Sequence, residues 1–238
     1  VITAGANQKP NETRLDLVQK NAKIMTDVVT QIKEQQYKGI LLIVSNPVDI
    51  MTQVAMEVSG FPEHRVFGSG TVLDSARLRY HLGQHLGVDS RSVHAFVIGE
   101  HGDSEIAAWS SANVSGVPLN SFCEMRGHYN HEGNTESIEE QVKNSAYEII
   151  AKKDATYYGI AMVVKRICQA IVRDEKSIFP ISLRMHGEYA LEDVVLSMPA
   201  IVGARGIETT IPISLDEKEV SRLHESAEML RETRKEIR

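Results

Sequence analysis

The chain has 238 residues, of which 42% are hydrophobic, 24% charged and 5% aromatic. This composition is that of an ordinary globular protein and excludes collagen-like, coiled-coil and disordered chains. A formal net charge of −6 argues against a nucleic-acid-binding protein, whose surface would be basic. The longest apolar run, 40–44, is far shorter than the roughly 20 residues that span a bilayer, so no membrane span is expected. Cys123 and Cys168 lie far apart and form no CxxC pair, which disfavours a disulfide framework and favours a reducing cytoplasm.

The first 68 residues alternate predicted strands and helices. In chain order these are a strand at 1–5 that ends in a glycine turn, an amphipathic helix at 15–32, an all-apolar strand at 40–44, a helix at 48–58 and a short strand at 65–67. Such alternation predicts a parallel sheet with helices on both faces. The chain opens inside the first strand, without a starting Met or a signal peptide, so we expect it to begin in the middle of a domain.

From residue 69 onwards the pattern changes to that of an α+β unit. Helices are expected at 71–85, 137–152, 155–172 and 216–236, and strands at 92–98, 107–111, 178–187, 193–203 and 207–213. The stretch 113–134 predicts loops. Because the last three strands alternate apolar and polar residues, they favour an antiparallel sheet. The sequence therefore predicts an α/β protein with a parallel sheet in 1–68 and an α+β domain in 69–238.

Two clusters of polar residues are candidates for catalysis. His101 lies between two glycines just after a predicted strand, and glycines allow a ligand to approach the backbone closely. A lone histidine, however, is more often a surface or structural residue. Asp74 and Arg77 are neighbours on a predicted helix, which suits a plain ion pair. They also suit a carboxylate that orients a histidine and a guanidinium that grips a substrate carboxylate.

Two further polar segments follow predicted strands of the parallel sheet, at 5–14 and 44–49. Ligands bind at the carboxyl ends of strands in such sheets, although composition alone also suits solvated loops. His128 and His131 follow Cys123, but their spacing fits no standard zinc signature, and we expect no metal site.

Taken together, these segments resemble the L-lactate dehydrogenase family, and closely its bacterial members, within the lactate/malate dehydrogenase superfamily. The resemblance covers the whole chain in order. It rests on Thr3-Ala-Gly-Ala-Asn-Gln-Lys-Pro, Ser45-Asn-Pro-Val-Asp, Gly68-Ser-Gly-Thr-Val-Leu-Asp-Ser-Ala-Arg, Ile98-Gly-Glu-His-Gly-Asp-Ser-Glu and Ala155-Thr-Tyr-Tyr-Gly.

The resemblance implies that 1–68 form the C-terminal part of a Rossmann-type NAD-binding domain and 69–238 the catalytic domain. Members of the family begin with a strand and a GxGxxG turn that holds the NAD pyrophosphate. That motif is absent from the sequence, and Gly68-Ser-Gly70 is its nearest approach. We therefore expect a chain that lacks roughly the first 80 residues of the family and is inactive by itself.

The resemblance also implies roles for individual residues. The implied catalytic residues are His101, which exchanges a proton with the substrate oxygen, Asp74, which orients His101, and Arg14, on a loop that closes over the substrate. The implied substrate-binding residues are Gln8, Arg14, Asn46, Asp74, Arg77 and Thr156. The implied NAD-binding residues are Gly5, Ala6, Val44, Ser45, Asn46, Ser69 and Ile160.

The implied activity is the reversible reduction of pyruvate to L-lactate with NADH, in fermentation. The family's malate dehydrogenases place an arginine where this chain has Gln8, and a buried second carboxylate would lack a partner beside a neutral amide. Gln8 therefore disfavours, but does not eliminate, the alternative of a malate or other 2-hydroxyacid dehydrogenase. A non-catalytic, structural use of the fold is a third alternative, because the cofactor site is incomplete.

Arg79 and His94 have the spacing of a regulatory site in this family. In bacterial members that respond to fructose 1,6-bisphosphate, an arginine and a histidine at these positions bind the phosphates. Taken alone, the two would be a solvated helix residue and an incidental strand residue. The resemblance implies that fructose 1,6-bisphosphate activates the protein across a two-fold axis of a homotetramer.

Overall fold

The computed structural model describes residues 1–6, 14–153 and 156–237. In its first part, helix α1 (Arg14–Glu34), strand β1 (Leu41–Ile43), helix α2 (Val48–Ser59) and strand β2 (Val66–Gly68) follow one another. β1 and β2 are parallel, and all three residues of β1 are buried, as an all-apolar run predicts. The predicted strand at 1–5 is reduced to a single parallel bridge between Ile2 and Ile43.

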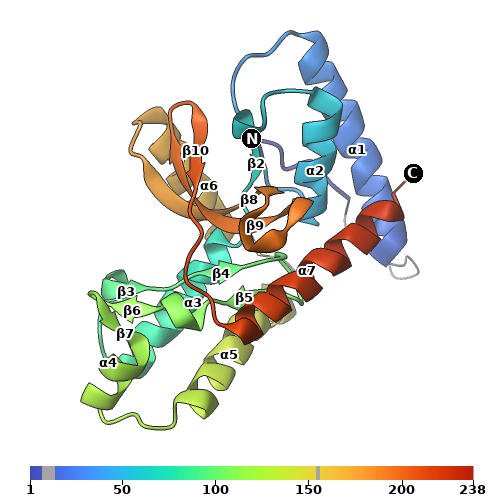
Figure 1. Cartoon of the computed structure of the whole chain (residues 1–238). Coiled ribbons are helices and arrows are strands. Elements are labelled where there is room, and N and C mark those ends of the chain that lie inside the picture. Colours follow the sequence, from blue (N-terminus) through green and yellow to red (C-terminus); the bar gives the residue numbers. More distant parts are fainter. Residues whose placement is uncertain (7–13, 154–155, 238) are drawn as a thin grey trace.

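The central sheet continues with the antiparallel strands β8 (Ser177–His186), β9 (Glu192–Gly203) and β10 (Gly206–Thr210). The strand order is β1-β2-β8-β9-β10, so parallel and antiparallel strands form one mixed five-stranded sheet (Figure 1). The expected α/β fold class is confirmed. Its two kinds of strand, however, share a sheet instead of lying in separate ones.

A glycine pair allows β2 to join β8. Gly68 pairs with Ser182, and a Cβ atom on Gly68 would lie 2.8 Å from that side chain. Gly70 has a φ of +52°, and a Cβ there would lie 2.6 Å from the carbonyl oxygen of Pro180. Side chains at either position would push the strands apart. This segment, the nearest approach in the sequence to a phosphate-binding turn, serves to bring the chain close to β8.

The remaining elements lie mostly below the central sheet in Figure 1. They are α3 (Val72–Leu86), β3 (Val93–His94), β4 (Val97–Ile98), β5 (Ile106–Ala107), β6 (Asn113–Val114), β7 (Val117–Pro118), α4 (Leu119–Met125), α5 (His131–Lys153), α6 (Tyr158–Val172) and α7 (Glu217–Lys235), with short 3-10 turns at Glu63–Arg65, Ser90–Ser92, Trp109–Ser111 and Glu188–Ala190. α7 begins at a capping box in which Asp216 accepts from the Glu219 N–H and the Glu219 side chain accepts from the Asp216 N–H.

Four of the predictions in this half are wrong. The strand expected at 92–98 is divided into β3 and β4, and β5 covers only the start of the one expected at 107–111. The stretch expected to form loops, 113–134, contains β6, β7 and α4. Leu119 and Cys123 are the buried residues of α4, and one four-residue step is too short a repeat to reveal a helix. α5 begins at His131 rather than 137. The prediction missed its first residues because they are polar and show no apolar periodicity.

Two hydrophobic cores meet at the middle of the molecule. The larger one packs α1, α2, α6 and α7 against the central sheet, and the smaller one lies among α3, β3 to β6, α4 and α5. β4 is bridged to β9 through Gly99 and Ser197, which places the following turn, 99–105, where the cores meet. α7 contacts α2, β9 and β5 and so touches both parts.

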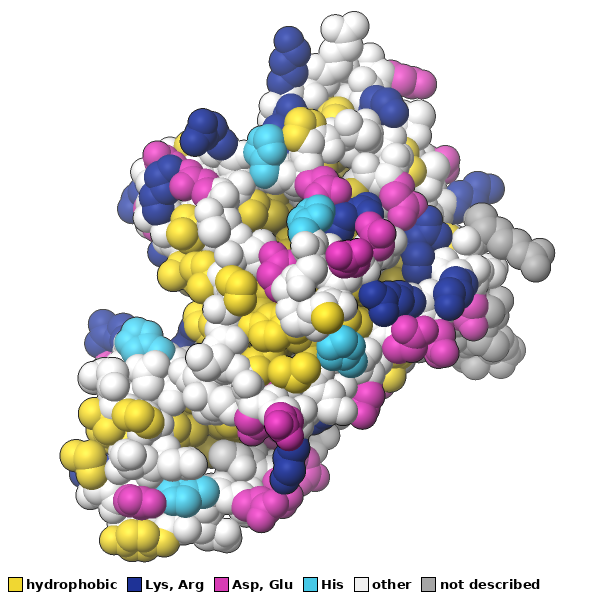
Figure 2. All heavy atoms as spheres, viewed as in Figure 1, with side chains coloured by type: hydrophobic (Ala, Val, Ile, Leu, Met, Phe, Trp, Pro, Cys, Tyr) yellow, Lys and Arg dark blue, Asp and Glu magenta, His cyan; other side chains and the backbone are white. Residues whose placement is uncertain are grey.

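On the face shown in Figure 2, basic and acidic side chains are interspersed and form no basic patch. Within residues 1–6, 14–153 and 156–237, no helix is both long and apolar enough to cross a membrane.

Candidate active site

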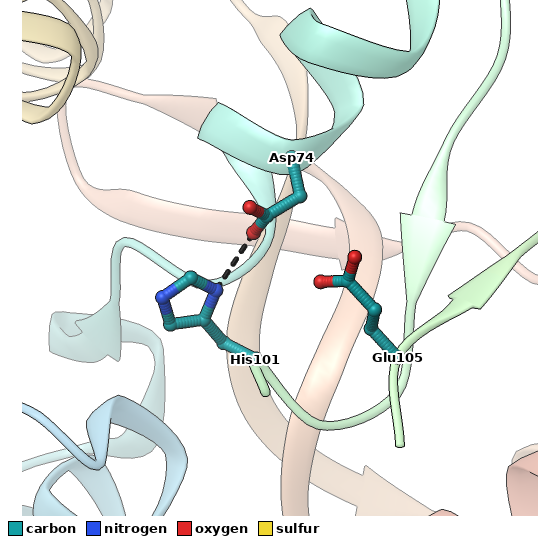
Figure 3. Close-up of side chains that lie close together, drawn as sticks. All are labelled: Asp74, His101 and Glu105. Atoms are coloured by element: carbon teal, nitrogen blue, oxygen red, sulfur yellow. Dashed lines mark hydrogen bonds and ion pairs between the residues drawn. The ribbon is translucent and has the colours of Figure 1, made fainter. Parts of the chain in front are cut away.

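His101 and Asp74 form a hydrogen-bonded pair where the two cores meet. Asp74 lies in the first turn of α3, where the helix dipole favours a carboxylate, and is 3% exposed. His101 lies on the turn after β4. The Asp74 Oδ2 atom is 2.7 Å from His101 Nδ1, and the other ring nitrogen, Nε2, faces away from the carboxylate (Figure 3). The carboxylate therefore fixes the ring and leaves Nε2 to meet a ligand.

Arg77 lies one helical turn after Asp74 and donates to its other oxygen. The distance from Nη1 to Oδ1 is 3.2 Å. The helical ion pair expected as the simpler alternative is thus present, together with the contact between Asp74 and His101. Because this bond engages one of the five guanidinium N–H donors, Arg77 can still offer two parallel donors to a carboxylate.

The turn that carries His101 is anchored from two helices. The His101 backbone N–H donates to Oδ2 of Asp49 on α2, at 2.7 Å. The neighbouring Glu100 N–H donates to Oγ of Ser226 on α7, at 2.8 Å. These bonds hold the imidazole at a set position relative to the central sheet.

The carboxylates around His101 hold it in the charged form. Burial alone would lower its pKa, but the charge and hydrogen bond of Asp74, followed by the charges of Asp49 and Glu105, raise the pKa to about 9. For Asp74, burial works in the opposite direction, and the charge and hydrogen bond of His101, with the charge of Arg77, lower its pKa. At neutral pH the pair is therefore an imidazolium and a carboxylate.

A second set of predicted residues lies just after Ile2, which is bridged to β1, and just after β1 itself. The side chain of Asn21, on α1, accepts from the Ala6 N–H at 2.7 Å and donates to the Asn46 carbonyl at 3.0 Å. Ser45 Oγ donates to the Ala4 carbonyl at 2.6 Å. These bonds bring four of the predicted NAD-binding positions, Gly5, Ala6, Ser45 and Asn46, to one edge of the sheet, next to Val44.

The other predicted site residues are less closely linked to this edge. Ser69 is buried at the end of β2, and its N–H donates to the Ile43 carbonyl at 2.8 Å. Thr156 is partly buried just before α6, and Ile160, in the first turn of α6, packs against the main core. Gln8 lies outside the described residues. Arg14 is the first residue of α1.

Comparison with known proteins identifies the family. The family model described as the lactate/malate dehydrogenase NAD binding domain matches residues 1–68, and that of the α/β C-terminal domain matches residues 71–238. The chain belongs to the lactate/malate dehydrogenase family.

Similar proteins of this family come from several bacteria. An L-lactate dehydrogenase of Acetivibrio thermocellus is 49% identical over 232 residues, which are 98% of this chain and 73% of that protein. An L-lactate dehydrogenase 1 of Lactococcus lactis subsp. lactis is 48% identical over 97% of this chain and 71% of that protein. The crystal structure of the minor L-lactate dehydrogenase of Enterococcus mundtii in its ligand-bound form has a TM-score of 0.95 and 43% identity, covering 99% of this chain and 75% of that one.

NAD is the cofactor of the lactate/malate dehydrogenase family, and the edge described above fits it. Small side chains stand at Gly5, Ala6 and Ser45, where neighbouring strands end and dinucleotides bind in such sheets. The backbone there is held by Asn21, a residue that belongs to none of the sequence motifs above. Asn21 lies on a helix with the spacing of a buried position, but its polar side chain gave no sign of this role.

Glu105 is a second residue without a predicted role. It is 5% exposed, and its carboxyl group, the Asp74 carboxylate and the His101 ring lie within 4.8 Å of one another (Figure 3). Burial, and then the charge of Asp74, raise the pKa of Glu105 to about 8. One imidazole and two carboxyl groups are also metal ligands, but here the Asp74 oxygens already accept from His101 and Arg77. The arrangement therefore favours proton transfer.

Proposed function

We propose that the protein is an L-lactate dehydrogenase, which reduces pyruvate to L-lactate with NADH and catalyses the reverse oxidation. The proposal depends on one observation above all, the contact between Asp74 and His101 in a chain of this family. The relatives reported above, named L-lactate dehydrogenases and 48–49% identical, support the choice of substrate.

The residues at the site have complementary tasks in this reaction. NADH, when bound, supplies the hydride that reduces the carbonyl carbon. Arg77 holds the substrate carboxylate through two parallel hydrogen bonds, and the amide of Asn46 holds the carbonyl oxygen. His101 Nε2 gives its proton to that oxygen as it becomes a hydroxyl, and takes it back in the oxidation of lactate. Asp74 keeps the ring oriented and favours its charged form throughout.

Three other residues complete the proposed site. Arg14 polarises the carbonyl group, and Thr156 and Gln8 contact the rest of the substrate. For NAD we propose Gly5, Ala6, Val44, Ser45, Asn46, Ser69 and Ile160 as the contacts. We further propose that 1–68 act as part of the NAD-binding domain and 69–238 as the catalytic domain.

The decisive experiment measures NADH oxidation by the purified protein with pyruvate and with oxaloacetate as substrates. We expect pyruvate to have the higher kcat/KM, and His101→Asn to abolish turnover. Gln8→Arg is expected to raise the oxaloacetate-to-pyruvate ratio of kcat/KM, because the guanidinium pairs with the second carboxylate. A wild-type preference for oxaloacetate would instead establish a malate dehydrogenase, and no turnover of either substrate a non-catalytic role.

We also propose a homotetramer that fructose 1,6-bisphosphate activates through Arg79 and His94. Arg79 is partly buried on α3, His94 is exposed on β3, and these elements pack together. Burial lowers the pKa of Arg79, and neither side chain forms an ion pair with a residue that the structure describes, which supports an anion as the missing partner. A bisphosphate would neutralise the cations and favour one quaternary state.

Titrating fructose 1,6-bisphosphate against the KM for pyruvate tests this regulation. We expect a lower KM for pyruvate in the wild type as the bisphosphate is added. The double variant Arg79→Gln with His94→Gln should not respond. Equal responses would refute the regulatory proposal and leave the catalytic one intact.

We also propose that the enzyme acts in the cytoplasm, in fermentation, which agrees with the free state of Cys123 and Cys168.

A further inference from the structure

Asp49 connects the turn that carries His101 with the central sheet. It lies in the first turn of α2 and is 1% exposed. Its Oδ2 atom accepts from the His101 backbone N–H at 2.7 Å, and its Oδ1 atom accepts from Ser182 Oγ on β8 at 2.6 Å and from Ser197 Oγ on β9 at 3.5 Å. One buried carboxylate therefore joins a helix, two strands and the proposed catalytic turn.

Asp49 also links His101 to Asn46, the residue proposed to bind the same substrate oxygen. It follows Asn46 by three residues and lies in the first turn of α2, the helix that Asn46 precedes, and Asn46 is held through its carbonyl by Asn21. In the proposed reaction, Asn46 and His101 bind the same substrate oxygen. A rigid link through Asp49 sets the distance between these two groups, and misplacement by about 1 Å can lower a rate about 100-fold.

Asp49 also contributes charge to the site. The ionisable groups around His101 are Asp74 and Arg77 from α3, Asp49 from α2 and Glu105 from the turn just before β5. Burial raises the pKa of Asp49 to about 6, against the hydrogen bonds from Ser182 and His101, so the group is an anion at neutral pH. Glu105, with a pKa of about 8, is largely neutral there. After Asp74, Asp49 is thus the main anion that favours the protonated imidazole.

We propose that Asp49 is a positioning residue of the reaction, which holds His101 in register with Asn46 and supports its charged form. This inference rests on the proposed dehydrogenase function. Asp49 then has a different role from Ser45 and Asn46, the proposed NAD contacts that precede it just after β1.

The test compares Asp49→Asn with Ser226→Ala. The asparagine side chain would place an amide against the His101 N–H or against Ser182 and would carry no charge. Ser226→Ala removes the other anchor of the same turn, at Glu100, without a change of charge. For Asp49→Asn we expect kcat for pyruvate to fall at least about tenfold with a KM change under about threefold. In the pH profile of kcat/KM, the decline at high pH (the alkaline limb) should move down by about one pH unit. Ser226→Ala should lower the melting temperature but leave that limb in place.

A purely structural role for Asp49 predicts a different outcome, in which both variants lower the melting temperature and neither moves the alkaline limb. That result would overturn the inference. If Asp49→Asn does not fold, Ser182→Ala replaces it, because it removes a donor to Asp49 and keeps the carboxylate. The kcat for pyruvate should then fall at least about twofold with a KM change under about threefold, since the carboxylate that positions His101 loses a bond to the sheet; an unchanged kcat would count against the inference.

One measurement separates this inference from the proposed function. NMR titration of the labelled His101 ring, in the wild type and in Asp49→Asn, requires no turnover. A lower His101 pKa in the variant supports the contact and the charge effect even if pyruvate is not a substrate. An unchanged His101 pKa, in an enzyme that does reduce pyruvate, would refute the role of Asp49 and leave the dehydrogenase function standing.

Discussion

Replacing Asp74 by asparagine should change the pH dependence of pyruvate reduction more than any other single substitution at the site. The His101 pKa rises from its ordinary 6.5 to about 9, with Asp74 as the largest source of the increase. A difference of this size corresponds to about 3 kcal/mol in favour of the imidazolium. Without the Asp74 charge, burial works against the remaining anions, and the pKa should return to about 6.5 or below.

The expected loss of rate follows from this shift. At about pH 7.5, nearly all wild-type His101 carries a proton, but only about one tenth would in Asp74→Asn. The rate at this pH should therefore fall at least about tenfold from protonation alone, and further because the ring loses its orienting contact. The alkaline limb of kcat/KM for pyruvate should move from near pH 9 to near pH 6.5.

The assay is NADH oxidation from about pH 5.5 to about pH 10, with Asp193→Asn as the control. Asp193 offers the same isosteric change at a side chain that is 86% exposed, and its variant should keep the wild-type profile. Stability adds a second test. Because the folded-state pKa of His101 is raised, its protonation adds to the free energy of unfolding fully below pH 6.5, and this addition is lost as the pH rises through 9. The difference in the free energy of unfolding between wild type and Asp74→Asn should therefore become smaller across this range. An Asp74→Asn limb that stays near pH 9 would refute this account of the site.

Three further predictions concern stability. The folded-state pKa of Glu105 is raised from 4.5 to about 8, so the native state binds the extra proton and loses stability as the pH rises through this window. Glu105→Gln cannot ionise, and its melting temperature relative to the wild type should rise by about 5 °C from about pH 5 to about pH 8; a constant difference would contradict the assignment. Gly70→Ala should destabilise by on the order of 3 kcal/mol in urea unfolding, because a Cβ would collide with the backbone of β8. Gly116→Ala, at a similar positive φ in open space, is the matched control and should cost about 1 kcal/mol; equal losses would exclude the collision as the cause. Asp216→Ala should cost about 1 kcal/mol by removing the cap from Glu219, and no change in the urea midpoint would show that the capping box does not stabilise α7.

Local patterns were sufficient for most of the elements that carry the site. The periodicity of 15–32 and 48–58 predicted α1 and α2, and the apolar run 40–44 predicted the buried strand β1, because the burial pattern of each recurs over neighbouring residues. The contact between Asp74 and His101 was an expectation of the family resemblance, since residue types alone left a helical ion pair and a structural histidine as alternatives. Short elements such as β6 and α4 escaped detection because they contain too few residues for a repeat.

By itself, then, the sequence determined the order of the main helices and strands, the family, and the identity of the residues proposed for catalysis. The tertiary structure alone decided that β2 pairs with β8, and so that parallel and antiparallel strands share one sheet. It also revealed Asp49, 52 residues away in the chain, and Glu105, across the turn that carries His101, as buried neighbours of His101. The pKa of each group depends on which charges pack around it and how completely water is excluded, and both are properties of the folded arrangement rather than of neighbouring residues in the chain.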